Sequence, residues 1–161
     1  NEKQRMIDEV KLNETVVDMF SGIGYFSILI AKHCNAKVYA MDINPKAAEY
    51  LRRNIWLNGV ESRVEVLEGD CRKFAPALEG VADRILMGYL FDTEKFLPDA
   101  ITMAKNKAII HFHRTVKEEE IDSFGKSLEK DRRIKVMQAR KIKSYAPKVW
   151  HMVYDLRVTK S

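Results

Sequence analysis

The stretch that decides the fold is residues 16–27, which read VVDMFSGIGYFS. An apolar run ends at Asp18, two glycines follow at Gly22 and Gly24, and an apolar pattern with helical spacing begins at Phe26. Glycine lets the backbone approach a ligand closely, because it has no side chain. The stretch therefore predicts a buried strand, a glycine turn and the start of a helix, with a ligand bound at the turn.

Length and composition indicate one globular domain over residues 1–161, because 46% of the residues are hydrophobic. No apolar run approaches the ~20 residues that a membrane span needs, and residues 1–11 lack the apolar core of a signal peptide. Cys34 and Cys71 do not have CxxC spacing, which favours reduced, buried thiols in a cytoplasmic protein. Because the first residue is not methionine, we expect a piece of a longer protein.

The charge is unevenly distributed. The chain has 28 Lys and Arg against 23 Asp and Glu, a net charge of +5. Between residues 132 and 148 no acid interrupts the bases, which are Arg132, Arg133, Lys135, Arg140, Lys141, Lys143 and Lys148. A solvated strand face and a contact with nucleic acid both fit this pattern, and the charge slightly favours nucleic acid.

Predicted strands and helices alternate along most of the chain. Strands are expected at 15–20, 37–41, 63–67, 83–88 and 107–113, and helices at 25–34, 45–58, 93–105 and 116–130. This alternation predicts an α/β domain with a parallel sheet and helices on both faces. Two further strands, 133–144 and 149–159, have only a short turn at 146–147 between them, so they must be antiparallel.

The ligand of such a sheet binds beyond the carboxyl ends of the strands. A dinucleotide fingerprint would need a third glycine at position 27, where this chain has Ser27. Asp18 would also repel a pyrophosphate at the helix start and suits a ligand with an ammonium group. A nicotinamide dehydrogenase is therefore disfavoured.

Three strand ends carry an acid: Asp18, Asp42 in MDINP and Asp70 in LEGDCRKF. Asp42 can accept hydrogen bonds from a ribose diol, and Asp70 can meet an adenine amino group. Asp18 would then face the amino-acid part of the ligand. Together they predict S-adenosylmethionine as a group donor, and no metal is expected.

Four motifs resemble a known family: DxFxGxG at 18–24, DINP at 42–45, NIWLN at 54–58 and GD at 69–70. They resemble the class I methyltransferase (Rossmann-like) fold, here a mostly parallel sheet with a C-terminal antiparallel strand pair. More narrowly, nearly the whole chain is similar to the group that modifies position 37 in the anticodon loop of tRNA. In that group a polar segment like residues 1–5 follows an N-terminal RNA-binding region, which we expect to be absent here.

The group has two branches, guanine-37 N1-methyltransferases and wybutosine-synthesising aminocarboxypropyltransferases. The methylating branch carries an Asn-Leu-Pro type stretch after the fourth strand, where this chain reads Met87-Gly88-Tyr89-Leu90. The resemblance therefore implies transfer of a 3-amino-3-carboxypropyl group from S-adenosylmethionine to C7 of 4-demethylwyosine at position 37 of tRNA-Phe, releasing methylthioadenosine. The alternatives are an N1-methyltransferase and a non-catalytic RNA-binding protein of the same fold.

The candidate site residues fall into three groups. Cofactor binding is predicted for Arg5, Asp18, Phe20, Gly22, Gly24, Asp42, Ile43, Asp70, Cys71 and Gly88. Substrate binding is predicted for Lys3, Asn54 and Tyr89, with Tyr89 stacked on a flipped base. Candidates for accepting the C7 proton are Glu2, His111 and His113.

Simpler interpretations stay open for several of these residues. Glu2 could belong to a flexible terminus, Tyr89 could pack in the core, and Asn54 could cap its helix. His111 and His113, two apart on one strand, share a face and could be a packed pair. We expect a monomer.

Overall fold

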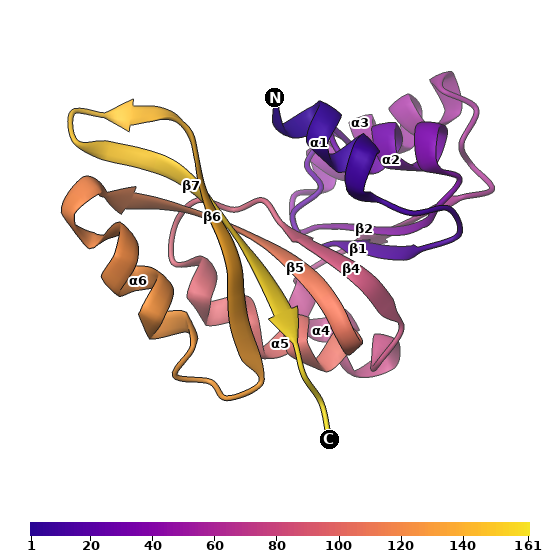
Figure 1. Cartoon of the computed structure of the whole chain (residues 1–161). Coiled ribbons are helices and arrows are strands. Elements are labelled where there is room, and N and C mark those ends of the chain that lie inside the picture. Colours follow the sequence, from indigo (N-terminus) through magenta and orange to yellow (C-terminus); the bar gives the residue numbers. More distant parts are fainter.

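The computed structural model describes all residues, 1–161, and contains one seven-stranded sheet of order β3-β2-β1-β4-β5-β7-β6. The strands are β1 (Thr15–Asp18), β2 (Lys37–Asp42), β3 (Val64–Glu68), β4 (Ala82–Met87), β5 (Ala104–Lys117), β6 (Ile134–Ala146) and β7 (Val149–Val158). The first five are parallel to one another, and β7 runs antiparallel to both β5 and β6. The predicted mostly parallel sheet with a C-terminal antiparallel pair is confirmed (Figure 1).

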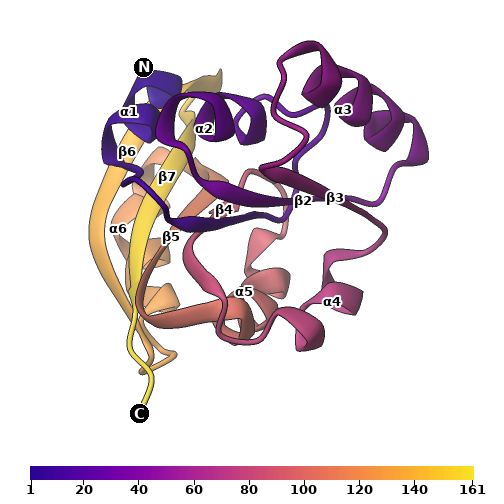
Figure 2. The ribbon, with the colours of Figure 1, turned by 90° about the vertical axis from the view of Figure 1, so that its right-hand side faces the viewer.

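Helices cover both faces of the sheet. The α-helices are α1 (Glu2–Glu9), α2 (Ser27–Cys34), α3 (Pro45–Leu57), α4 (Cys71–Phe74), α5 (Leu97–Met103) and α6 (Ile121–Leu128), with 3-10 turns at Pro76–Leu78, Thr93–Phe96 and Glu118–Glu120. Figure 2 shows α1, α2 and α3 along one face and α4 and α5 along the other, and each face buries its own apolar cluster. No helix is long and apolar enough to cross a membrane.

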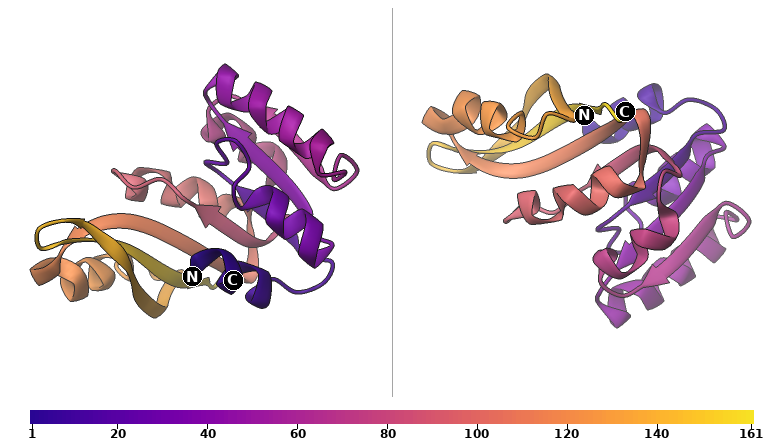
Figure 3. Two further views of the ribbon diagram at one scale, coloured as in Figure 1. Left: turned by 90° about the horizontal axis from the view of Figure 1, so that it is seen from above. Right: turned by 90° about the horizontal axis from the view of Figure 1, so that it is seen from below.

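The sheet divides into a compact parallel part and a long antiparallel part. Seen from above and below, the long strands β5, β7 and β6 extend well beyond the parallel strands, and the sheet twists between the two parts (Figure 3). β5 pairs with β7 without a break from Ile109 to Lys117. The antiparallel part therefore forms an arm beside the carboxyl ends of β1 and β4.

Local signals explain the ends of α3. The Asn44 side chain accepts hydrogen bonds from the amides of Lys46 and Ala47, and Pro45 occupies the first helical position. Gly59, at φ +65°, follows the last turn. Pro45 and Gly59 are the signals in the sequence from which a helix at 45–58 is predicted, and the Asn44 cap adds to them.

Several predicted element boundaries were wrong. The strand predicted at 107–113 is longer at both ends, since β5 runs from Ala104 to Lys117. The helices predicted at 93–105 and 116–130 are correspondingly shorter and consist of α5 and α6, each preceded by a 3-10 turn. Pairing with β7 draws residues 114–117 into the sheet, and local periodicity does not reveal such a partner. Two helices were missed, α1 and α4. In α1, the Asn1 side chain caps the Gln4 amide while Met6 is buried.

Candidate active site

A cavity of about 390 Å³ opens at the carboxyl ends of β1 to β4. We call it the cofactor cavity. Of the residues predicted to bind the cofactor, it is lined by Phe20, Gly22, Asp42, Ile43, Asp70, Cys71 and Gly88. Tyr89, predicted to contact the substrate, lines it too. The strand ends thus bring together most of the predicted set, as the parallel sheet requires.

Asp42 connects the two loops that form one wall of this cavity. Its Oδ2 accepts a hydrogen bond from the Gly22 amide at 2.9 Å, and its Oδ1 accepts one from the Asn44 amide at 2.9 Å. Gly22 has φ +56°, a conformation that glycine adopts without strain. Each carboxylate oxygen keeps a further lone pair, so Asp42 can still accept hydrogen bonds from a diol in the cavity.

Asp70 is engaged at the start of α4. Its Oδ1 accepts from the Arg72 amide at 2.9 Å, and its Oδ2 accepts from Arg72 Nη2 at 2.6 Å. The Arg72 side chain lowers the pKa of Asp70 to about 2, so the carboxyl is charged at neutral pH. Arg72 itself lines the cavity and was missed by the sequence analysis, although it lies two residues after Asp70.

Asp18 does not line the cofactor cavity. It is 3% exposed, and its Oδ2 accepts a hydrogen bond from the Ser27 hydroxyl at 2.7 Å. Burial raises the pKa of the Asp18 carboxyl to about 6, against hydrogen bonds from Ser27 and the Phe20 amide that lower it. Asp18 thus ties the end of β1 to the start of α2, beneath the glycine turn.

The raised pKa of Asp18 leads to a prediction for stability. The folded protein binds a proton at Asp18 that the unfolded chain has lost between about pH 4 and 6, so stability falls as the pH rises through this window. Asp18→Asn removes the buried charge and should raise the free energy of unfolding by about 1–3 kcal/mol at pH 7.5. Urea titrations at pH 7.5 and pH 4 check this. A gain that persists unchanged at pH 4 would contradict the assignment.

Gly24 and Asn54 also act outside the cavity. A Cβ on Gly24, whose φ is +99°, would lie 2.6 Å from Ile28 Cδ1 and 2.7 Å from Leu51 Cδ1. Gly24 therefore allows α2 and α3 to pack closely. The Asn54 side chain donates to the Ile23 carbonyl at 3.0 Å, which holds the glycine turn against α3.

A second cavity of about 380 Å³ lies where α1 faces the antiparallel arm. We call it the N-terminal cavity. It brings together Glu2, Lys3 and His113 from the predicted site, and Tyr25 and Phe26 also line it. Since the cofactor cavity is lined by Phe20 and Gly22, the two cavities border opposite ends of the same glycine turn.

Glu2 is held firmly at this cavity. Arg5 Nε and Nη2 donate to its two carboxylate oxygens at 2.7 and 2.8 Å. Arg5 also pairs with Glu9 at 3.0 Å and with Asp155 at 2.9 Å. Glu2 is therefore an oriented carboxylate within α1. Arg5, predicted to bind the cofactor, lies away from the cofactor cavity and acts on Glu2.

His113 forms a pair with His151, which the sequence analysis missed. His113 Nδ1 and His151 Nε2 lie 2.9 Å apart, and His151 Nδ1 has no hydrogen-bond partner. Burial, followed by the neighbouring His151, lowers the pKa of His113 to about 3. His113 is therefore neutral and only weakly basic at physiological pH.

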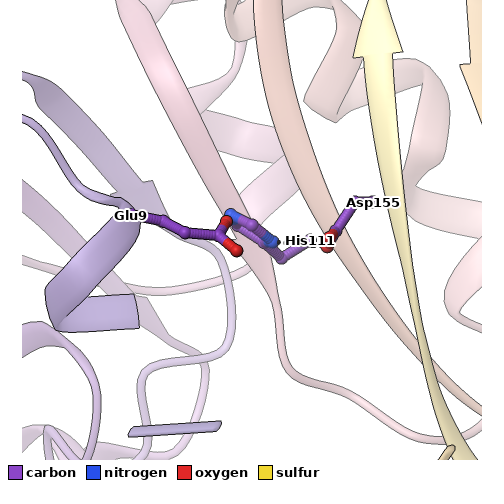
Figure 4. A group of neighbouring side chains, drawn as sticks. All are labelled: Glu9, His111 and Asp155. Carbon is purple, nitrogen blue, oxygen red and sulfur yellow. Dashed lines mark hydrogen bonds and ion pairs between the residues drawn. The ribbon is translucent and has the colours of Figure 1, made fainter. Parts of the chain in front are cut away.

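His111 lies in different surroundings, although it shares a face with His113. It is fully buried, and Figure 4 shows its ring between Glu9 and Asp155. Arg84 Nη1 lies 2.9 Å from His111 Nε2, and His111 Nδ1 lies 2.7 Å from Asp155 Oδ1. Because arginine can only donate, Nε2 accepts and Nδ1 carries the proton.

Ligand atoms of Glu9, His111 and Asp155 lie within 4.8 Å of one another, a spacing that a metal ion could use. Both ring nitrogens of His111 are engaged, and Arg5 and Arg84 pair with the acids. The positive charges that a metal would supply are thus already present. The cluster is a buried ion-pair network that joins α1 to β4, β5 and β7.

The strand order and the acids at neighbouring strand ends define a domain of the S-adenosylmethionine-dependent, class I methyltransferase type. Residues 1–141 match the family described as the TRM5/TYW2 methyltransferase domain, and the chain belongs to this family. The family resemblance found in the sequence is thereby confirmed.

Named relatives include members of both branches. The chain is 45% identical to the tRNA(Phe) (4-demethylwyosine(37)-C(7)) aminocarboxypropyltransferase of Pyrococcus horikoshii. The alignment covers 99% of this chain and 59% of that protein. The crystal structure of P. horikoshii TYW2 in complex with MeSAdo superimposes with a TM-score of 0.91 at 43% identity, covering 99% of this chain and 62% of that one. A tRNA (guanine(37)-N(1))-methyltransferase, Trm5b, of Methanocaldococcus jannaschii is 34% identical over 99% of this chain and 45% of its own length.

The chain thus spans about three fifths of the length of the curated aminocarboxypropyltransferases that it matches, 59% in one case and 64% in another.

Proposed function

We propose that this chain is the S-adenosylmethionine-binding catalytic domain of a tRNA-modifying enzyme. The proposed reaction transfers the 3-amino-3-carboxypropyl group to C7 of 4-demethylwyosine at position 37 of tRNA-Phe and releases methylthioadenosine. The name of the 45%-identical P. horikoshii relative supports this reaction. Support also comes from the cofactor cavity, which presents Asp42 and Asp70 for the ribose and the adenine.

The observation that carries the choice between the two branches is the end of β4. There Gly88 and Tyr89 line the cofactor cavity, and neither has a side-chain amide. An amide at this place suits an acceptor nitrogen, with which it can exchange hydrogen bonds. A ring carbon such as C7 needs no such partner, and the face of Tyr89 can stack on the base that carries it.

The chemistry is a displacement at carbon. C7 attacks the γ-carbon of the methionine arm, the bond from this carbon to the sulfonium sulfur breaks, and its electron pair stays on sulfur as neutral methylthioadenosine. The C7 proton is then lost, which restores the aromatic ring. Two tasks fall to the protein: to align acceptor and γ-carbon, and to accept the proton.

Glu2 is our proposed proton acceptor. It lines the N-terminal cavity, and Arg5 orients it through two hydrogen bonds. His113 lines the same cavity but is a weaker candidate, because burial lowers its pKa to about 3. We assign His111 to holding Asp155, and through it Arg5, in place.

The remaining site residues have proposed roles in binding. Lys3 lies with its Nζ 3.6 Å from the centre of the Tyr25 ring, at the rim of the N-terminal cavity, where a cation can meet RNA phosphate. Asn54 orders the glycine turn. We further propose a cytoplasmic monomer with one catalytic domain, and its two free, buried cysteines fit a reducing compartment.

The test uses the full-length protein, S-adenosylmethionine labelled at its carboxyl carbon, and tRNA-Phe bearing 4-demethylwyosine. Methylthioadenosine together with label on the RNA is the expected result. S-adenosylhomocysteine without label on the RNA would overturn the proposal in favour of methyl transfer. Failure to bind S-adenosylmethionine at all would favour a non-catalytic RNA-binding protein.

A further inference from the structure

A continuous row of aromatic rings leads out of the cofactor cavity. Its inner end is Phe20, whose ring stacks on Tyr89 with centroids 5.2 Å apart. Tyr89 contacts Phe91 at 6.2 Å, and Phe91 contacts Tyr145 at 6.0 Å, both edge to face. We call Tyr89, Phe91 and Tyr145 the outer row.

The outer row joins two segments that are far apart in the sequence. Tyr89 and Phe91 follow β4, whereas Tyr145 lies near the end of β6, beside its turn into β7. Figure 1 shows this β6–β7 hairpin reaching beyond the parallel part of the sheet. The row therefore runs from the site of chemistry onto the antiparallel arm.

The outer rings are open to solvent. Tyr89 is 42% exposed, Phe91 48% and Tyr145 51%. Three large exposed rings in contact form an apolar patch, and a patch that begins in a ligand cavity marks a place where a partner binds. Phe91 and Tyr145 do not line the cofactor cavity, so the cofactor alone does not explain them.

The charges near the outer row indicate what kind of partner would bind it. Lys141, Lys143 and Lys148 are exposed on the same hairpin as Tyr145, and no acid lies between residues 132 and 148. The acids that follow Phe91 are neutralised, since Asp92 pairs with Lys95 at 3.6 Å and Glu94 with Arg114 at 2.9 Å. Lys141 also pairs with Glu118 at 3.6 Å, whereas no ion pair engages Lys143 or Lys148. Apolar rings beside exposed lysines suit an anionic chain that carries flat groups.

We propose that the outer row is a stacking surface for unpaired RNA nucleotides that flank the base being modified. This inference rests on the proposed function, in which that base stacks on Tyr89. Neighbouring nucleotides of the loop must then pass over the rim of the cofactor cavity, where rings accept any base by stacking and lysines contact phosphates. Tyr89 takes the acceptor base, and Phe91 and Tyr145 take its neighbours.

The test compares Phe91→Leu and Tyr145→Leu in the full-length protein. Trp56→Leu is the matched control, because Trp56 is 69% exposed on α3, away from the row. The probes are an RNA hairpin with the anticodon loop, carrying a fluorescent adenine analogue beside the acceptor position, and a blunt duplex of its stem. Each row variant should weaken hairpin binding about 5- to 100-fold and reduce quenching of the analogue.

Three further readouts separate stacking from misfolding or lost charge. S-adenosylmethionine affinity and the melting temperature should stay at the wild-type values, and the salt dependence of RNA binding should keep its slope, since no cation is removed. Duplex binding and the Trp56→Leu control should also stay unchanged.

The proposal is overturned if hairpin affinity is unchanged in both row variants, or if hairpin and duplex lose affinity equally. A dimer of the wild-type protein that the row variants dissociate would assign the row to a second copy instead. A failure of the proposed function can be told apart from a failure of this inference. The first would change the nucleoside by-product that the wild-type enzyme releases, whereas the second would appear in the affinity of the row variants for the hairpin.

Discussion

Glu2→Gln is expected to lower the turnover number about 10²- to 10⁴-fold, the usual contribution of a positioned general base. Glutamine keeps the size of the side chain but cannot take up the C7 proton. The affinity for S-adenosylmethionine should change little, because Glu2 lines the N-terminal cavity and not the cofactor cavity. Because methylthioadenosine forms before the proton is lost, the effect is measured as steady-state formation of the rearomatised, modified nucleoside in digested tRNA.

Glu9→Gln is the matched control for Glu2→Gln. Glu9 lies on the same helix and contacts the same arginine, at 3.0 Å, but does not line the N-terminal cavity. It should retain turnover within about threefold. With substrate deuterated at C7, the Glu2 variant should show an isotope effect, since proton loss becomes rate-limiting. A Glu2 variant with nearly full turnover would transfer the role to His113, which His113→Asn would then test.

Asp42→Ala is expected to weaken S-adenosylmethionine binding about 10- to 100-fold. Hydrogen bonds to a charged acceptor contribute about 1.5–3 kcal/mol, and the substitution also frees the Gly22 and Asn44 amides that Asp42 holds. Both the ribose contact and the shape of the glycine turn are lost. Calorimetric titration with S-adenosylmethionine and with methylthioadenosine measures the effect.

Glu68→Ala provides the control for Asp42→Ala. Glu68 stands opposite Asp42 in the β2–β3 register, but it pairs with Arg52 and does not line the cavity. Its affinity for both ligands should match that of the wild type. Methylthioadenosine keeps the ribose and lacks the methionine arm, so Asp42→Ala should weaken both ligands equally. Weakening of S-adenosylmethionine alone would contradict a ribose contact.

Residues close together in the sequence were predicted well. The strand, the glycine turn and the helix over residues 16–27 are visible in spacing and residue type, and so are the signals at the ends of α3. Asp42 and Asp70 meet in one cavity because β2 and β3 are parallel neighbours, whose carboxyl ends lie at the same edge. The sequence by itself thus determined the fold class, the family and most of the cofactor cavity.

Only the tertiary structure decided what the remaining residues contact. The antiparallel pairing of β5 and β7 places Asp155 opposite His111 and brings His151 to His113, about 40 residues away in the chain. Because of this pairing, His111 is part of an ion-pair network, whereas His113 lines the N-terminal cavity. Burial of Asp18 and the contact between Phe91 and Tyr145 likewise depend on packing between distant segments, which a local pattern does not encode.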